Sequence, residues 1–286
     1  MLSLTLIIVA LFVLLMAAIT DLKAFEVPDW LNYAGIAAGI GIHLIFSLQQ
    51  WNYWPISSSL IGFGIGFALA CTMYYTGQWG GGDAKLLMAL GALIGFEPSK
   101  LAFGTSFLIN LAFVGGAWGL LWTSALAIKN AKTFLKKFKE TRNENKYKKL
   151  RIMTLFTTGI LLTASFIITN FRFELISLAL IGYVLCYLTI FIKSTELSSM
   201  HKWVTPDKLT EGDWLVEPVK YGKEKLMPPK LGLEKEHLAL LQKLYAQKKI
   251  DKVLVKYGVP FAPAFLIAFI ATLLFNNIIF TIITQV

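Results

Sequence analysis

Long segments without charged residues dominate this chain of 286 residues and constrain its fold more than any other feature. A helix that crosses a bilayer needs about 20 predominantly apolar residues. Here 56% of the residues are hydrophobic and only 15% are charged, so lipid is the solvent for most of the chain. The sequence predicts an all-α polytopic membrane protein with about eight transmembrane helices. The predicted spans are 2–20, 31–49, 56–76, 83–96, 101–128, 153–170, 174–192 and 261–283.

The polar stretches between these spans divide the chain into five predicted parts. Residues 1–128 form a membrane core of five helices, 129–152 a basic cytoplasmic loop, and 153–192 a helical hairpin. Residues 193–260 contain Pro- and Gly-rich turns followed by one amphipathic stretch. They are expected to form a small cytoplasmic insert domain before the last transmembrane helix, 261–286.

Basic residues fall almost entirely on one side of the predicted topology. Of the 27 Lys and Arg residues, most lie in the blocks 129–151 and 193–260. Basic loops stay in the cytoplasm, which predicts a cell-membrane protein with both termini outside. Topology and attraction to anionic lipid headgroups account for the net charge of +10, so no nucleic-acid partner is expected.

Small residues four positions apart predict close approach between helices. The pairs are Gly35 and Gly39, Gly62 and Gly66, Gly66 and Ala70, and Gly115 and Gly119. The two cysteines, Cys71 and Cys186, lie inside apolar segments and form no CxxC pair. The cysteines therefore indicate neither a zinc site nor a disulfide framework. No metal or cofactor is predicted, and the oligomeric state stays open.

Two aspartates stand where the cytoplasmic side meets an apolar segment. Asp21 ends the first span in AAITDLKAF, and Asp83 opens the fourth span in GGGDAKLL. Ionisable residues inside membrane segments are costly and usually functional, and the charge distribution puts both aspartates at the same depth. Each also has a purely structural explanation, since Asp21 could cap the end of its helix and Asp83 could be an N-cap.

Two neighbouring carboxyl groups do not both ionise readily, so they share one proton. The ionised group can take a proton from a water molecule while the protonated group polarises a carbonyl, which is aspartic peptidase chemistry. A carboxylate pair in a helical bundle could instead bind ions in a transporter or support an assembly scaffold. Both alternatives stay open at this point.

The residues around Asp83 suit a site that another chain approaches. Gly80, Gly81 and Gly82 have no Cβ, so they can adopt positive φ and let an extended substrate backbone come close. Lys85 could add positive potential, although a residue two positions away on a helix need not face Asp83.

At these residues the chain resembles the type IV prepilin peptidase and archaeal preflagellin peptidase family, which are membrane aspartic peptidases of the GxGD kind. The stretch GGGDAKL, 80–86, is similar to the family pattern G-x-G-D-x-K-L. Asp21 with the later VPD, 27–29, resembles the first catalytic aspartate and its downstream turn, and YGVPFAPAF, 257–265, resembles the start of the family's last helix. The resemblance implies that Asp21 and Asp83 are the catalytic pair.

The resemblance also implies a substrate and an origin. The expected partners are pilin-like or archaellin precursors, cut on the cytoplasmic side just before their hydrophobic helix. The chain has none of the paired CxxC zinc motifs of the bacterial members, which favours an archaeal enzyme. Such precursors carry a short basic leader, so Glu26 and Asp29 could bind it, or could belong to a solvated turn.

Overall fold

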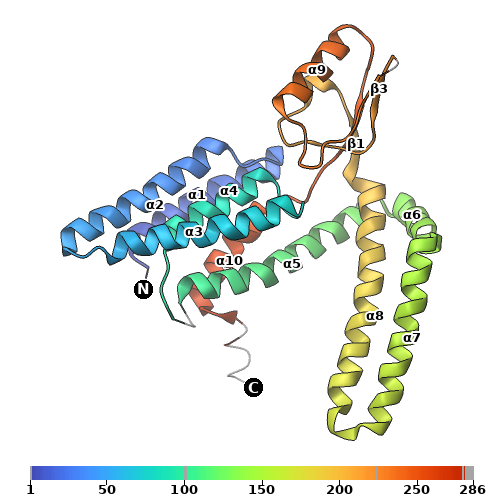
Figure 1. Ribbon diagram of the computed structural model, residues 1–286, viewed down its shortest axis with the longest axis horizontal. Helices are drawn as coiled ribbons and strands as arrows, with labels where there is room; N and C mark the ends of the chain where they lie inside the picture. Colours follow the sequence, from blue (N-terminus) through green and yellow to red (C-terminus); the bar gives the residue numbers. More distant parts are fainter. Residues whose placement is uncertain (1, 100–101, 223, 279, 281–286) are drawn as a thin grey trace. The chain divides into compact units, whose positions relative to one another are not determined.

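The computed structural model describes residues 2–99, 102–222, 224–278 and 280, and Figure 1 shows their path. The chain divides into two compact units. The first unit contains residues 1–121, 204–253 and 257–286, and the second contains 122–203 and 254–256.

The first unit contains most of the apolar helices. Its helices are α1 (Leu4–Ala24), α2 (Asp29–Gln50), α3 (Trp54–Tyr75), α4 (Gly81–Ile94), α9 (Lys235–Ala246) and α10 (Ala262–Phe275). The long helix α5 (Phe103–Lys129) belongs to it as far as residue 121. The second unit continues with α6 (Ala131–Asn143), α7 (Asn145–Ile167) and α8 (Arg172–Thr195).

Each of the eight predicted spans contains one apolar helix. Within the described residues, α1, α2, α3, α5, α7 and the segment 169–200 around α8 are long and apolar enough to cross a bilayer, as expected of a multi-pass membrane protein. Helices α4 and α10 have 14 residues each, about 21 Å at 1.5 Å per residue. Six described helices therefore have spanning length, and the predicted count of eight includes two shorter ones.

Helix α4 is the most enclosed helix of the first unit, and glycines on its neighbours explain why. It packs against both α2 and α3, and these helices lie side by side in Figure 1. A Cβ at Gly39 would lie 2.7 Å from the backbone of Ala92, and one at Gly66 would lie 2.9 Å from the Leu87 carbonyl oxygen. A Cβ at Gly62 would come even closer to the carbonyl oxygen of Gly91. The predicted glycine pairs of α2 and α3 thus form the surfaces that hold α4.

Helix α10 is shorter than the predicted last span, 261–283, because two asparagines interrupt it. Asn276 adopts a φ of 55°, which a helix cannot continue through. The buried side chain of Asn110 on α5 binds this helix end: its Nδ2 donates to Thr272 Oγ1 at 2.9 Å and to the Asn276 carbonyl at 2.6 Å. Its Oδ1 accepts from the Ile278 N–H at 3.1 Å. The rest of the predicted span, at 279 and 281–283, lies outside the described residues.

The segment between the hairpin and α10 contains short strands in addition to turns. They are β1 (His201–Val204), β2 (Trp214–Leu215), β3 (Val219–Tyr221), β4 (Glu224–Leu226) and β5 (Val253–Lys256). Strands β3 and β4 form an antiparallel hairpin in which Val219 faces Leu226, and β1 lies next to β5. Helix α9 covers the predicted amphipathic stretch and buries Leu241 and Leu244.

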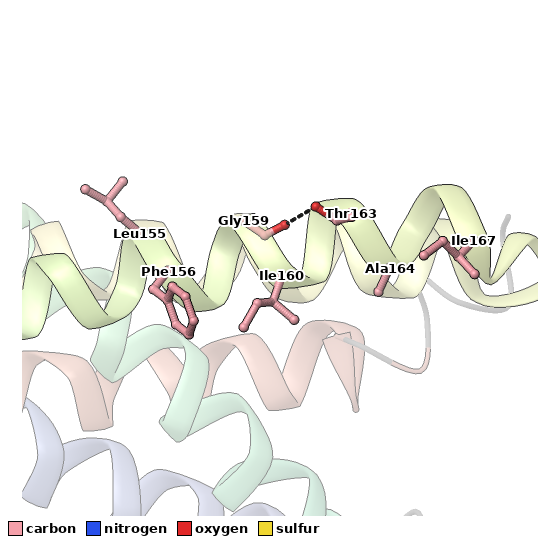
Figure 2. A pocket seen from close by; sticks show the side chains of 7 residues that line it. All are labelled: Leu155, Phe156, Gly159, Ile160, Thr163, Ala164 and Ile167. Carbon is pink, nitrogen blue, oxygen red and sulfur yellow. Dashed lines mark hydrogen bonds between the residues drawn. The ribbon is translucent and has the colours of Figure 1, made fainter.

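In the second unit, α7 and α8 pack against each other, and α6 packs against α8. The basic stretch 129–152 is helical for most of its length, since α6 ends at Asn143 and α7 begins at Asn145. A shallow apolar groove runs along α7 (Figure 2). Seven residues of α7 line it, including Gly159, whose carbonyl accepts a hydrogen bond from Thr163 Oγ1. None of the seven is ionisable, so this groove is not the candidate active site.

Candidate active site

Asp21 lies in the last turn of α1 and is buried, with 5% of its surface exposed. Its Oδ2 accepts a hydrogen bond of 2.8 Å from the N–H of Ala262, which is the first residue of α10. The first N–H groups of a helix have no partner inside the helix, so a carboxylate satisfies one of them here. Asp21 is therefore tied to an element 241 residues away in the sequence.

Asp83 lies in the first turn of α4, two residues after the helix begins at Gly81. Its carboxyl lies close to Gly80, with 3.8 Å between Oδ2 and the position of a Cβ added at this glycine, so the N–H of Gly80 faces the region of the carboxyl, as the N-cap N–H does in a capping box. Helices α1 and α4 pack against each other. The carboxyl groups of Asp21 and Asp83 lie near enough for their charges to interact. The sequence predicted only that both residues lie at a similar depth, and in the structure the packing of α1 against α4 brings their carboxyl groups near each other.

The three glycines before Asp83 differ in their surroundings. None of Gly80, Gly81 and Gly82 has a positive φ in this structure, although glycine can adopt one. The close approach does occur, but with the protein's own chain: a Cβ at Gly82 would lie 3.2 Å from the backbone N of Val27. Val27 follows α1, so Gly82 lets the segment after Asp21 pack directly against the start of α4.

Lys85 does not face Asp83. Its Nζ lies 2.6 Å from Oδ1 of Asp29 in a partly exposed ion pair, and 5.6 Å from the centre of the Tyr33 ring. Because Asp29 and Tyr33 both belong to the first turns of α2, this pair joins α2 to α4. The charge of Asp29 is therefore balanced within the protein.

Glu26 is exposed directly after the left-handed residue Phe25, which ends α1 with a φ of 60°. The Phe25 ring packs edge-on against Tyr257, with 5.4 Å between ring centres. Asp213 lies near enough to Glu26 for their charges to interact. Burial raises the pKa of Asp213, the charge of Glu26 raises it further, and a hydrogen bond from the Thr210 N–H opposes both. This contact could not be predicted from the sequence, since the two acids are far apart in the chain.

Asn32 is a further residue of this region that sequence reasoning missed. It is fully buried in α2, and its Nδ2 donates to the carbonyl of Gly82 at 3.3 Å. Among the described residues, its Oδ1 has no hydrogen-bond partner. The available signal was a polar side chain inside the predicted span 31–49, three positions after Asp29. Asn32 helps to fix the backbone immediately before Asp83.

The arrangement supplies acid–base chemistry from protein groups. Within the described ranges, no three His, Cys, Asp or Glu side chains gather closely enough to hold a metal ion. The groups that the fold brings together are two carboxyl groups, one partly exposed, and the backbone N–H groups of Ala262 and Gly80. A carboxyl pair of this kind can activate a water molecule and protonate a leaving group.

Comparison with known proteins finds similarity over the part of the chain that contains both aspartates. Residues 8–120 match the model of the type IV leader peptidase family. A preflagellin peptidase of Methanococcus voltae is 27% identical over 157 residues, which cover 55% of this chain and 67% of that protein. The prepilin peptidase EppA of Methanothermobacter thermautotrophicus is 26% identical over 190 residues, 60% of this chain and 48% of that protein.

A second preflagellin peptidase, from Methanocaldococcus jannaschii, is 37% identical over 81 residues, 28% of this chain and 34% of the relative. The chain thus spans about two thirds of the first of these relatives and half or less of the other two. No solved structure matches the chain significantly.

Proposed function

We propose that this protein is a membrane aspartic endopeptidase, because residues 8–120 match the model of the type IV leader peptidase family. It removes the short leader of type IV pilin-like or archaellin precursors on the cytoplasmic side of the cell membrane. The observation that carries the proposal is the packing of α1 against α4, with interacting carboxyl groups at Asp21 and Asp83. The relatives come from methanogens, in agreement with an archaeal enzyme.

In the proposed reaction, the ionised carboxylate of the pair removes a proton from a water molecule as its oxygen attacks the scissile carbonyl carbon. The other carboxyl group donates a hydrogen bond to the carbonyl oxygen, where negative charge develops. The tetrahedral intermediate then collapses, the C–N bond breaks, and the leaving nitrogen receives a proton from the pair. The products are the leader, with a new carboxylate, and the mature precursor, with a new amino terminus.

The surroundings of the pair support a division of roles among the remaining predicted residues. Gly82 is covered by Val27, so Gly80 and Gly81 are the glycines that a substrate backbone can reach. Glu26 is exposed and is the proposed contact for a basic leader. Asp29 already pairs with Lys85, which gives both residues a structural role between α2 and α4.

The basic helix α6 supports the proposed contact with anionic lipid headgroups. The Phe134 ring packs on Phe191 of α8, with 5.4 Å between ring centres. Basic residues occupy other positions of the same helix: Lys132, Lys136, Lys137, Lys139 and Arg142. A helix with one apolar face and several cations is suited to the surface of an anionic bilayer.

The direct test is a cleavage assay with the purified full chain in liposomes. The substrate is a precursor that carries a pilin-like basic leader before an apolar helix. We expect Asp21→Asn and Asp83→Asn each to reduce the cleavage rate by about 10²–10⁴-fold, the range for loss of general acid–base catalysis. Asp251→Asn changes an exposed aspartate of the insert and serves as the matched control.

Folding of each variant is checked by its helical circular dichroism and by its elution from a sizing column. Full cleavage by either folded site variant would refute the aspartic mechanism and favour ion transport or a scaffold. Equal loss in Asp251→Asn would show that the assay responds to charge in general.

A further inference from the structure

The position of the Asp21 carboxyl depends on where α10 begins. The N–H that it accepts from belongs to Ala262, and both residues are buried. A shift of this helix start would move the donor away from Oδ2 or would rotate the carboxyl with it. The residues that hold the start of α10 therefore also hold Asp21.

Two contacts with α5 fix the chain immediately before Ala262. Trp118 Nε1 donates to the carbonyl of Pro260 at 2.7 Å. The ring of Phe261 occupies the space beside Gly115, where an added Cβ would lie 2.5 Å from its Cζ and 3.2 Å from its Cε2. Gly115 is itself buried. This glycine leaves room for an aromatic ring that a larger residue would displace.

The same ring also reaches the loop before Asp83. Phe261, Phe265 and Trp79 form an aromatic cluster in which the ring centres are 5.3–5.6 Å apart. Trp79 directly precedes Gly80, which lies beside the Asp83 carboxyl. The Phe261 ring thus lies next to Ala262, whose N–H binds Asp21. It also packs on Trp79, which precedes the glycines before Asp83.

We propose that Phe261 is a positioning residue for the carboxyl pair, seated against Gly115 on α5 and against Trp79 before the glycine loop. It holds the Ala262 N–H on Asp21 and keeps the two aspartate-bearing segments in register. This inference rests on the proposed peptidase function for its effect on rate, whereas its effect on the Ala262 hydrogen bond is independent of that function.

The test compares two alanine substitutions on adjacent residues of α5. Gly115→Ala places a methyl group against the Phe261 ring, and the ring cannot turn aside freely because Trp79 and Phe265 pack against it. Gly116→Ala is the matched control, since Gly116 is exposed and a Cβ there meets no atom within 4 Å. Both changes favour helix formation to the same degree.

We expect Gly115→Ala to lower kcat by about 10- to 100-fold, because small misplacements of catalytic groups have effects of this size. KM should stay within about twofold, as for a change that affects the reaction step rather than binding. Gly116→Ala should match the wild type in both constants. In the Gly115→Ala background, Phe261→Leu removes part of the ring and should restore part of the lost kcat.

Residue-resolved amide hydrogen exchange supplies a readout that does not need cleavage. The Ala262 N–H should exchange faster in Gly115→Ala than in the wild type and Gly116→Ala. Equal exchange rates at Ala262 in Gly115→Ala and Gly116→Ala would overturn the inference. It would also be overturned if the fold-loss of kcat in the double variant equalled the product of the losses in Gly115→Ala and Phe261→Leu. If Asp21→Asn cleaves normally, the peptidase proposal fails. The exchange rates at Ala262 still test whether Phe261 positions the start of α10.

Discussion

Replacing Asn110 by leucine should destabilise the protein, because the Asn110 side chain binds the polar groups at the C-terminal end of α10. The amide binds the Thr272 hydroxyl, the Asn276 carbonyl and the Ile278 N–H, and it is fully buried. Leucine has a similar volume but no polar atom, so the two backbone groups would lose this partner. A buried polar group left without a partner costs about 1–3 kcal/mol, while single hydrogen bonds between membrane helices are worth about 0.6–2 kcal/mol. We therefore expect a loss of about 2–4 kcal/mol in unfolding free energy.

The measurement is reversible unfolding in mixed micelles with increasing dodecyl sulfate, followed by helical circular dichroism. Ser106→Ala is the matched control, because Ser106 lies one turn before Asn110 on α5 and is also fully buried. Its hydroxyl has no hydrogen-bond partner among the described residues, so its removal should leave stability unchanged or raise it slightly. The reasoning fails if Asn110→Leu stays within about 0.5 kcal/mol of the wild type, the usual range of surface changes, or if both variants lose equal stability.

Three further changes test other parts of the structure. Gly39→Ala should destabilise by about 1–3 kcal/mol, as overpacking does, because its Cβ would press on the α4 backbone; Gly41→Ala, with open space around it, should not, and the same micelle titration compares them. Glu26→Lys should raise KM for precursors with a basic leader more than Asp29→Lys does, since Asp29 is already neutralised by a lysine; equal KM values for the wild type and both variants would remove the leader contact. Burial raises the pKa of Asp213, so the folded state binds more protons than the unfolded state between the unfolded pKa, about 4, and the higher folded pKa. Stability therefore falls as pH rises through this range. Asp213→Asn should reduce that fall, which melting temperatures measured across this pH range will show, and an unchanged slope would contradict the assignment.

The sequence predicted the helices well because their signal is local. Segments of about 20 apolar residues and glycines four positions apart each have a direct physical meaning in lipid. Gly39 and Gly66 do make the close helix contacts that their spacing indicates. The lengths of α4 and α10 were harder to predict. Helix α4 has only 14 residues and is enclosed by its neighbours, and α10 ends where Asn276 adopts a positive φ.

At the candidate site, the sequence indicated which residues carry the chemistry but not their contacts. Asp21 and Asp83 stood out because carboxylates are rare beside apolar segments. The contact of Asp21 with Ala262 could not be found in this way, because a backbone N–H has no sequence signature. The pairing of Lys85 with Asp29 likewise depends on how α2 lies against α4.

The burial of α4 between α2 and α3 determines which side of the carboxyl pair can adjust. Backbone touches backbone at the glycines of these three helices, with no side chain between them to change rotamer. Asp83 thus belongs to a tightly packed block formed by α2, α3 and α4. Asp21 instead belongs to α1, which packs against α10 as well as against α2 and α4. Helix α10 contacts α5 and the segment before α4 through aromatic rings and single hydrogen bonds. Any fine adjustment of the distance between the two acids during turnover is therefore easier for α1 and α10 than for the block that carries the glycine loop.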